Sequence, residues 1–88
     1  MREVEKNGVV YEIDDMEVFW LILLDKFSSG SASVFADYTD LSDRQVNRKF
    51  LKLFNAGLVN RYRNSLYDPY YYFLTSSGMQ LVIDDYYS

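Results

Sequence analysis

With 88 residues and an apolar fraction of 49%, the chain is expected to fold as one domain, 1–88, around a single modest core. It contains neither Cys nor His, which excludes disulfides, zinc fingers, thiol nucleophiles and imidazole bases, so we expect no metal, no cofactor and no enzyme chemistry. The net charge is −4, whereas domains that bind nucleic acids are commonly basic, so the distribution of charge along the chain has to be considered.

Residues 1–13 are predicted to form a short strand or an ordered arm. Asn7-Gly8 is a turn signal, and the VVYEI that follows alternates weakly in a composition typical of β-strands. The opening MREVEKNG lacks the apolar region of a secretion signal. No apolar run reaches the roughly 18 residues that a membrane span needs. We therefore expect a cytoplasmic protein without a membrane partner.

The segment 14–27 has the pattern of a helix that Asp14 or Asp15 can cap. Large apolar residues recur in it at helical spacing, namely Met16, Trp20, Leu23, Leu24 and Phe27. The run from Val18 to Leu24 is also apolar all round, so the helix must be covered on more than one side. Two interpretations remain open: it is the central core helix of a small domain, or its second face is a dimer interface.

After a Ser- and Gly-rich loop, a short helix is expected over 31–38. Ser31 or Ser33 can cap this helix, and its inward residues would be Val34, Phe35 and Tyr38. Thr39-Asp40-Leu41 then connects it to the next helix. Two short helices joined by so tight a turn are typical of a helix-turn-helix.

The helix predicted over 42–56 has the clearest signals in the chain. Ser42 and Gln45 have the spacing of a capping box, and Gly57 supplies the residue that ends helices. One stripe of the helix is apolar: Val46, Phe50, Leu53 and Phe54. The opposite side is largely basic, with Arg44, Arg48, Lys52 and Asn55. The helix is therefore predicted to bury one face and to expose a cationic one.

A β-hairpin is expected over 58–74, with strands at Val59–Arg63 and Tyr70–Leu74 joined by a turn. Arg61 and Arg63 lie two residues apart and share one face of the first strand, although parity does not tell whether that face is the outer one. Five of the nine tyrosines fall between positions 62 and 72. They are expected to pack across the strand pair, or, at Tyr67 or Tyr70, to contact a nucleic acid.

Thr75 can cap a last helix over 76–86, in which an apolar stripe is expected from Met79, Val82, Ile83 and Tyr86. The paired acids Asp14-Asp15 and Asp84-Asp85 do not indicate carboxylate catalysis. Adjacent residues of a helix point about 100° apart, so their carboxylates do not converge. Capping and solvation account for both pairs.

Charge is divided unevenly along the chain. Residues 1–43 carry ten acids and three bases, 44–63 carry six bases and no acid, and 64–88 carry three acids. The positive charge is therefore concentrated on the predicted helix 42–56 and the first strand of the hairpin. Such segregation is a directional footprint for a polyanion rather than a uniform repulsion.

Two motifs resemble a known fold. Leu41-Ser42, then Val46, Arg48, Phe50 and Leu53 at helical spacing, then Gly57-Leu58-Val59, resemble the recognition helix of winged helix-turn-helix domains, in particular those of MarR- and PadR-type transcription regulators. In YYFLTSSG, the residues Tyr72, Leu74, Thr75 and Gly78 resemble the Y-x-L-T-x-x-G ending of the wing in those families. The two motifs occur in the expected order and at the expected separation.

This resemblance implies an α+β winged helix-turn-helix fold, with a three-helix core, a β-hairpin wing and a short C-terminal helix. It also implies a transcription regulator that binds double-stranded DNA sequence-specifically, with the helix 42–56 in the major groove and the wing on the backbone. The residues expected at DNA are Ser42, Arg44, Gln45, Asn47, Arg48, Lys49, Lys52, Arg61, Arg63 and Tyr67.

Within this set, Arg44, Gln45 and Arg48 are expected at base edges, and the lysines and wing arginines at phosphates. Terminal helices pair the subunits in those families, so we expect a homodimer through the helices 14–27 and 76–86, although the C-terminal segment is shorter here. The alternative is a winged-helix module that binds another protein and not DNA, through the acidic residues 1–43 and the Tyr-rich hairpin.

Overall fold

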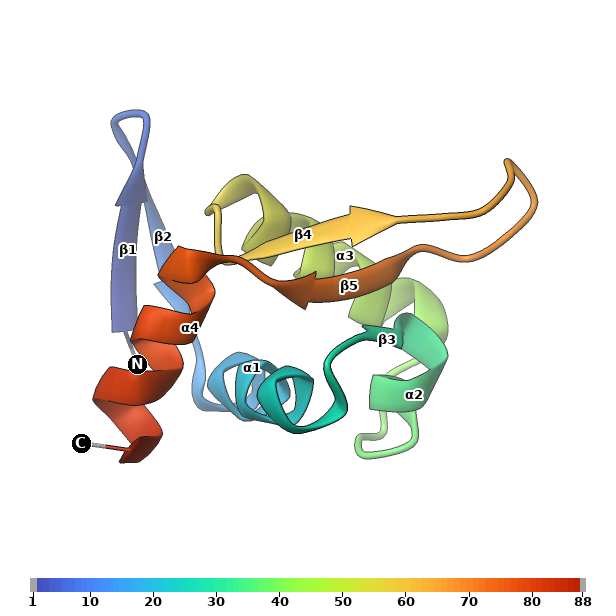
Figure 1. The fold of residues 1–88 in the computed structure, drawn as a ribbon, viewed down its shortest axis with the longest axis horizontal. Helices are drawn as coiled ribbons and strands as arrows, with labels where there is room; N and C mark the ends of the chain where they lie inside the picture. The colour runs from blue at the N-terminus through green and yellow to red at the C-terminus, as the bar shows by residue number, and fades with distance from the viewer. Residues whose placement is uncertain (1, 88) are drawn as a thin grey trace.

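The computed structural model describes residues 2–87, which form four α-helices and two small antiparallel sheets (Figure 1). This confirms the expected α+β class. In chain order the elements are β1 (Arg2–Lys6), β2 (Val9–Ile13), α1 (Asp15–Phe27), β3 (Gly30–Ser31), α2 (Ala32–Ala36), α3 (Asp43–Asn55), β4 (Val59–Tyr62), β5 (Tyr71–Leu74), α4 (Ser76–Val82) and a π-helical turn (Ile83–Tyr87).

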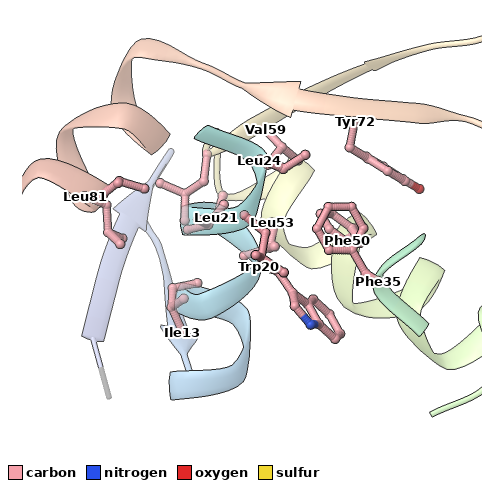
Figure 2. Packing of buried hydrophobic residues seen from close by; sticks show 14 of the residues in the cluster. Ile13, Trp20, Leu21, Leu24, Phe35, Phe50, Leu53, Val59, Tyr72 and Leu81 are labelled. Carbon is pink, nitrogen blue, oxygen red and sulfur yellow. The ribbon is translucent and has the colours of Figure 1, made fainter. Parts of the chain in front are cut away.

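The N-terminal segment is a two-stranded hairpin rather than the single strand or arm that its sequence predicts. Strand β1 pairs with β2 so that Lys6 lies opposite Val9, which leaves a loop of only Asn7 and Gly8. Both loop residues have positive φ, 53° and 80°, as a tight hairpin turn requires. The hairpin stands beside α4, and Ile13 at its end is completely buried in the core (Figures 1 and 2).

The core is organised around a stack of aromatic rings from three elements (Figure 2). Trp20 of α1 stacks on Phe50 of α3, with ring centroids 5.3 Å apart, and Phe50 stacks on Tyr72 of β5 at 4.4 Å. Phe35 of α2 packs against both Trp20 and Phe50. All four residues are at most 1% exposed, so the stack fixes α1, α2, α3 and the sheet relative to one another.

Helix α1 buries most, but not all, of the apolar stripe read from its sequence. Trp20, Leu23 and Leu24 are buried, whereas Met16 and Phe27 are 39% and 42% exposed. Phe19 is 45% exposed although it lies in the run that is apolar all round. The helix therefore serves as the core helix and also presents apolar side chains to solvent.

The short helix α2 runs over Ala32–Ala36, inside the expected 31–38. Its cap residue Ser31 accepts no helix N–H, and its hydroxyl shares a hydrogen bond with that of Ser33 at 3.0 Å instead. Phe35 is buried as expected, whereas Val34 and Tyr38 are exposed. The residues before the helix, Gly30–Ser31, form β3 and pair with β5, although their sequence had indicated only a loop. A two-residue strand is too short to carry a periodic signal.

The second sheet has the strand order β3-β5-β4, with β4 and β5 antiparallel and Arg61 opposite Tyr72. Side chains of Arg61 and Tyr72 share the face toward α3, because opposed residues point to the same side of a sheet. The opposite face carries Tyr62, which stacks on Tyr71 across the strand pair at 5.6 Å. The loop 63–70 extends beyond the body of the molecule (Figure 1).

The chain after β5 departs from the helix expected over 76–86. Helix α4 ends at Val82 and a π-helical turn, Ile83–Tyr87, follows. Leu81 and Val82 are buried, but Ile83 and Tyr86 of the expected stripe are 39% and 50% exposed. A π-turn holds more residues per turn than an α-helix, which rotates the later side chains away from the core.

Candidate nucleic-acid interface

Helix α3 is held at both ends and buried along one stripe. Its first turn is closed by a capping box, in which the Ser42 N–H donates to Gln45 Oε1 at 2.9 Å and the Gln45 N–H to Ser42 Oγ at 3.2 Å. Val46, Phe50 and Leu53 are completely buried. These contacts leave the side that carries Arg44, Asn47 and Arg48 facing solvent.

An open groove of about 410 Å³ lies between this side of α3 and the β4–β5 hairpin. Helix α3 and the hairpin both line it, through Arg44, Asn47, Arg48, Leu51, Arg61, Asp68, Pro69, Tyr70 and Tyr72. Three guanidinium groups therefore converge on one surface from two elements, against a single carboxylate. The groove combines positive charge with aromatic walls.

Stacking fixes the arginines of the hairpin. The guanidinium carbon of Arg61 lies 4.4 Å from the ring centroid of Phe54 and 4.2 Å from that of Tyr70. Arg63 lies 4.6 Å from the same Tyr70 ring. The face that Arg61 and Arg63 share is thus the one turned toward α3, which parity alone had left open. A stacked guanidinium keeps the hydrogen-bond donors at its edges available.

Asn47 is oriented by the sheet. Its Oδ1 accepts a hydrogen bond from the hydroxyl of Tyr72 at 3.0 Å, which leaves its amide N–H groups to face the groove. Burial raises the pKa of Tyr72 above its ordinary value of 10.0, against the opposing effect of the nearby Arg61. The phenol therefore stays protonated at neutral pH and can keep donating to Asn47.

Lys49 and Lys52 lie on a different side of α3 and pair with acids of the N-terminal part. Lys49 Nζ is 3.0 Å from Asp14 Oδ2. Lys52 Nζ is 2.7 Å from Oε1 of the completely buried Glu17 and donates to the carbonyl of Glu12. The six cations of 44–63 are therefore divided. Three arginines line the groove, Arg63 stacks on Tyr70 beside it, and the two lysines neutralise carboxylates of the chain itself.

The remaining expected site residues are also separated from one another. Ser42 and Gln45 use their side-chain oxygens within the capping box, which does not involve the amide nitrogen of Gln45. Tyr67 lies at the tip of the hairpin loop and is 97% exposed. It does not line the groove.

Sequence reasoning named Tyr70 as a possible contact but missed the other apolar and aromatic residues of the groove. Leu51 is 43% exposed there, one helical turn beyond Asn47, and the helical spacing could have located it. Phe54 was assigned to the buried stripe, but it is only partly buried and supports Arg61. Tyr72 was expected as part of a family motif and as one of the tyrosines that pack across the hairpin. Its bond to Asn47 depends on the strand register, which the sequence does not specify.

Comparison with known proteins adds no relative: no family model matches the chain, and no curated protein sequence is similar to it. Within residues 2–87, no helix is both long and apolar enough to span a bilayer. The same residues contain no group of three or more acidic side chains placed to hold a metal ion. Functional inference therefore depends on the groove.

Proposed function

We propose that the chain is a winged helix-turn-helix protein of the kind that MarR- and PadR-type regulators represent, and that it binds double-stranded DNA in a sequence-specific way to regulate transcription. Helix α3 would enter the major groove and the β4–β5 hairpin would lie on the backbone as the wing. Two features support this proposal. The helices α2 and α3 are followed by the β4–β5 hairpin, and β5, the central strand of the sheet, packs on α3 through Tyr72.

The observation that carries the proposal is the convergence of Arg44, Arg48 and Arg61 on one groove in a protein of net charge −4. Arg44 and Arg48 are exposed in the first half of α3, from which recognition helices reach base edges. Arginine pairs bidentately with guanine in the major groove. Asn47, with its amide oriented by Tyr72, is suited to adenine.

Arg61 and Arg63 would meet phosphates from the hairpin side. With these two arginines neutralising phosphates, the logarithm of the binding constant should fall with the logarithm of salt concentration at a slope of about −1.8 per protomer. Lys49 and Lys52 would contribute less than sequence reasoning expects, because each already has a carboxylate partner.

The test is a titration of duplexes of about 30 base pairs, selected by the protein from a random pool, over a series of salt concentrations. Arg44→Ala and Arg48→Ala should each weaken binding to the selected site by about 1–3 kcal/mol and relax specificity. Lys6→Ala is the matched control, because it removes an exposed cation of β1 that lies outside the groove.

Two results would overturn the proposal. One is a failure of the wild-type protein to retain any duplex at about 50 mM salt. The other is an equal loss of affinity in Lys6→Ala and Arg44→Ala, which would mean that only net charge matters.

We also propose that the protein pairs with itself through α1 and the C-terminal turn. A shallow depression between them is lined by Val18, Phe19 and Ile22, with Arg2 and Asp85 at its edge. A two-fold dimer that buries these apolar side chains against a second copy would carry two α3 helices, the number that a palindromic site requires. Sedimentation should show a dimer at tens of micromolar, and Phe19→Ser should shift it to monomer.

A second candidate function is that of a protein-binding module. Its supporting observation is the exposed cluster in which Tyr38 contacts Phe19 and Phe27, each with ring centroids 6.4 Å apart. Contiguous exposed apolar side chains are typical of interaction surfaces. This candidate is favoured if Phe19→Ser leaves the oligomeric state unchanged while the wild-type protein retains no DNA at low salt.

A further inference from the structure

The hairpin loop between β4 and β5 presents two large apolar side chains to solvent. Leu66 is 78% exposed and Tyr67 is 97% exposed, the two highest values for large apolar residues within 2–87. Their neighbours in the loop, Asn64-Ser65 and Asp68-Pro69, are polar or turn-forming. Neither side chain packs in the core, so their exposure at the tip indicates a contact with another molecule.

The tip is an ordered turn rather than a slack loop. The Asp68 N–H donates to the Ser65 carbonyl at 3.2 Å, and the Tyr67 N–H lies 3.3 Å from Ser65 Oγ. Leu66 and Tyr67 are therefore the two central residues of a β-turn, where Pro, Asn, Asp and Gly normally predominate. Because the turn is already formed, little backbone entropy would be lost when the tip binds.

The charge of the hairpin ends before its tip. Arg61 and Arg63 stack on Tyr70 at the base of the loop, whereas residues 64–70 contain no Lys or Arg and one acid, Asp68. The tip therefore has no cation with which to hold a phosphate. Apolar and aromatic contact is the chemistry that its side chains offer.

We propose that Leu66 and Tyr67 form an apolar wedge that enters the minor groove and partly unstacks a base step, kinking the duplex. This inference rests on the proposed DNA binding by α3. Leu66 is five residues beyond Arg61, and because residues 65–68 form a turn its reach is less than the roughly 16 Å of a fully extended chain. With Arg61 at a phosphate bordering the major groove, that reach carries the tip over the backbone to the adjacent minor groove, where apolar side chains wedge between base steps.

The experiment uses the full chain and a duplex of about 30 base pairs with an A·T-rich centre, fluorescent dyes at both ends and 2-aminopurine at central steps. Binding of the wild-type protein should raise 2-aminopurine fluorescence as bases unstack. Energy transfer between the ends should also rise, as expected for a bend of roughly 20–90°. The first signal reports on unstacking and the second on bending, and the wedge requires both at once.

The double variant Leu66→Ser/Tyr67→Ser should bind about tenfold more weakly, the scale of losing one base–aromatic contact, and should give neither signal. The matched control is Val9→Ser/Val10→Ser, which removes two exposed apolar side chains from the other hairpin. Circular dichroism verifies that each variant is folded.

The outcomes separate the wedge from the proposed function. If the wild-type protein binds the duplex but gives no 2-aminopurine or bending signal, or if the double variant keeps wild-type affinity and bending, the wedge is overturned and DNA binding by α3 stands. If the wild-type protein binds no duplex, the proposed function fails and the wedge fails with it.

Discussion

The hydroxyl of Tyr72 in β5 donates a hydrogen bond to Oδ1 of Asn47 in α3, 3.0 Å away. The central strand of the sheet thereby sets the orientation of a side chain that faces the groove. Tyr72→Phe keeps the ring that stacks on Phe50 and removes only the donor. We expect about 1 kcal/mol lower stability and an affinity for the selected DNA site about fivefold lower, because the amide of Asn47 is released.

Urea unfolding and DNA titration of the same variant separate the two effects. The double variant Tyr72→Phe/Asn47→Ala should bind no more weakly than Asn47→Ala alone, since the hydroxyl acts through that amide. Independent, additive losses of affinity would contradict this coupling.

The pair formed by Lys52 and Glu17 should matter more to stability than the pair formed by Lys49 and Asp14. Glu17 is completely buried, so Lys52→Met leaves a buried carboxylate without its cation, and we expect a loss of about 2–3 kcal/mol in urea unfolding. Lys49→Met is the matched control: the Asp14 side chain is 37% exposed, and the loss should stay below about 1 kcal/mol.

Neutralising the buried acid tests the physical reason for this loss. Glu17→Gln keeps the residue type that a capping box accepts, so Glu17→Gln/Lys52→Met should recover most of the stability lost in Lys52→Met. A double variant as unstable as the single one would show that lost packing of the lysine stem, and not an unpaired charge, is responsible.

Asp14 should make the stability of the protein depend on pH in the acid range. Burial raises the pKa of Asp14, but the Glu17 N–H and the charges of Lys49 and Lys52 outweigh it and hold the pKa below the ordinary 3.8. A lowered folded-state pKa means that the contribution of Asp14 is complete above 3.8 and is lost as pH falls through the folded-state value.

The measurement is urea unfolding of the wild-type protein and of Asp14→Asn from about pH 7 down to about pH 2. Asn is also a good N-cap, so the variant removes the charge and keeps the cap of α1. The wild-type protein should be the more stable at neutral pH, and the difference should vanish at the acid end. A difference that does not change with pH would assign the effect to geometry alone.

Gly78 should tolerate no side chain, because α4 approaches the turn before β4 closely at this residue. A Cβ added to Gly78 would lie 2.0 Å from the carbonyl oxygen of Leu58 and 3.1 Å from a methyl group of Leu74. We expect Gly78→Ala to lower the free energy of unfolding by about 3 kcal/mol, despite the better helix propensity of alanine. Ser77→Ala, at the exposed neighbour, should be neutral, and a stable Gly78→Ala would show that α4 shifts easily.

Sequence patterns that involve residues close together in the chain predicted the structure of α3 correctly. The capping box of Ser42 and Gln45 and the buried stripe of Val46, Phe50 and Leu53 were expected and are present, because both depend on residues within a few positions of each other. The exposed basic face was expected as one surface but is divided. Lys52 pairs with Glu17, 35 positions away, and that contact exists only because α1 packs beside α3.

Elements whose structure depends on a partner could not be found from the sequence. REVEK is rich in charge and resembles an exposed arm, and it becomes β1 only by pairing with β2 across the Asn7-Gly8 turn. Gly30–Ser31 forms a strand only because β5 lies beside it. The groove likewise depends on the register that sets Arg61 opposite Tyr72, a tertiary property that periodicity does not encode.

The burial of the single tryptophan has a practical consequence. Trp20 is 0% exposed and lies 5.3 Å from Phe50, on the side of α3 that faces away from the groove. Its emission should be that of an indole in an apolar medium and should shift to the red when the helices separate. The emission wavelength of Trp20 therefore reports on the packing of α3 against α1. A change in the tilt of α3 should shift that wavelength, so it can be followed without an attached label.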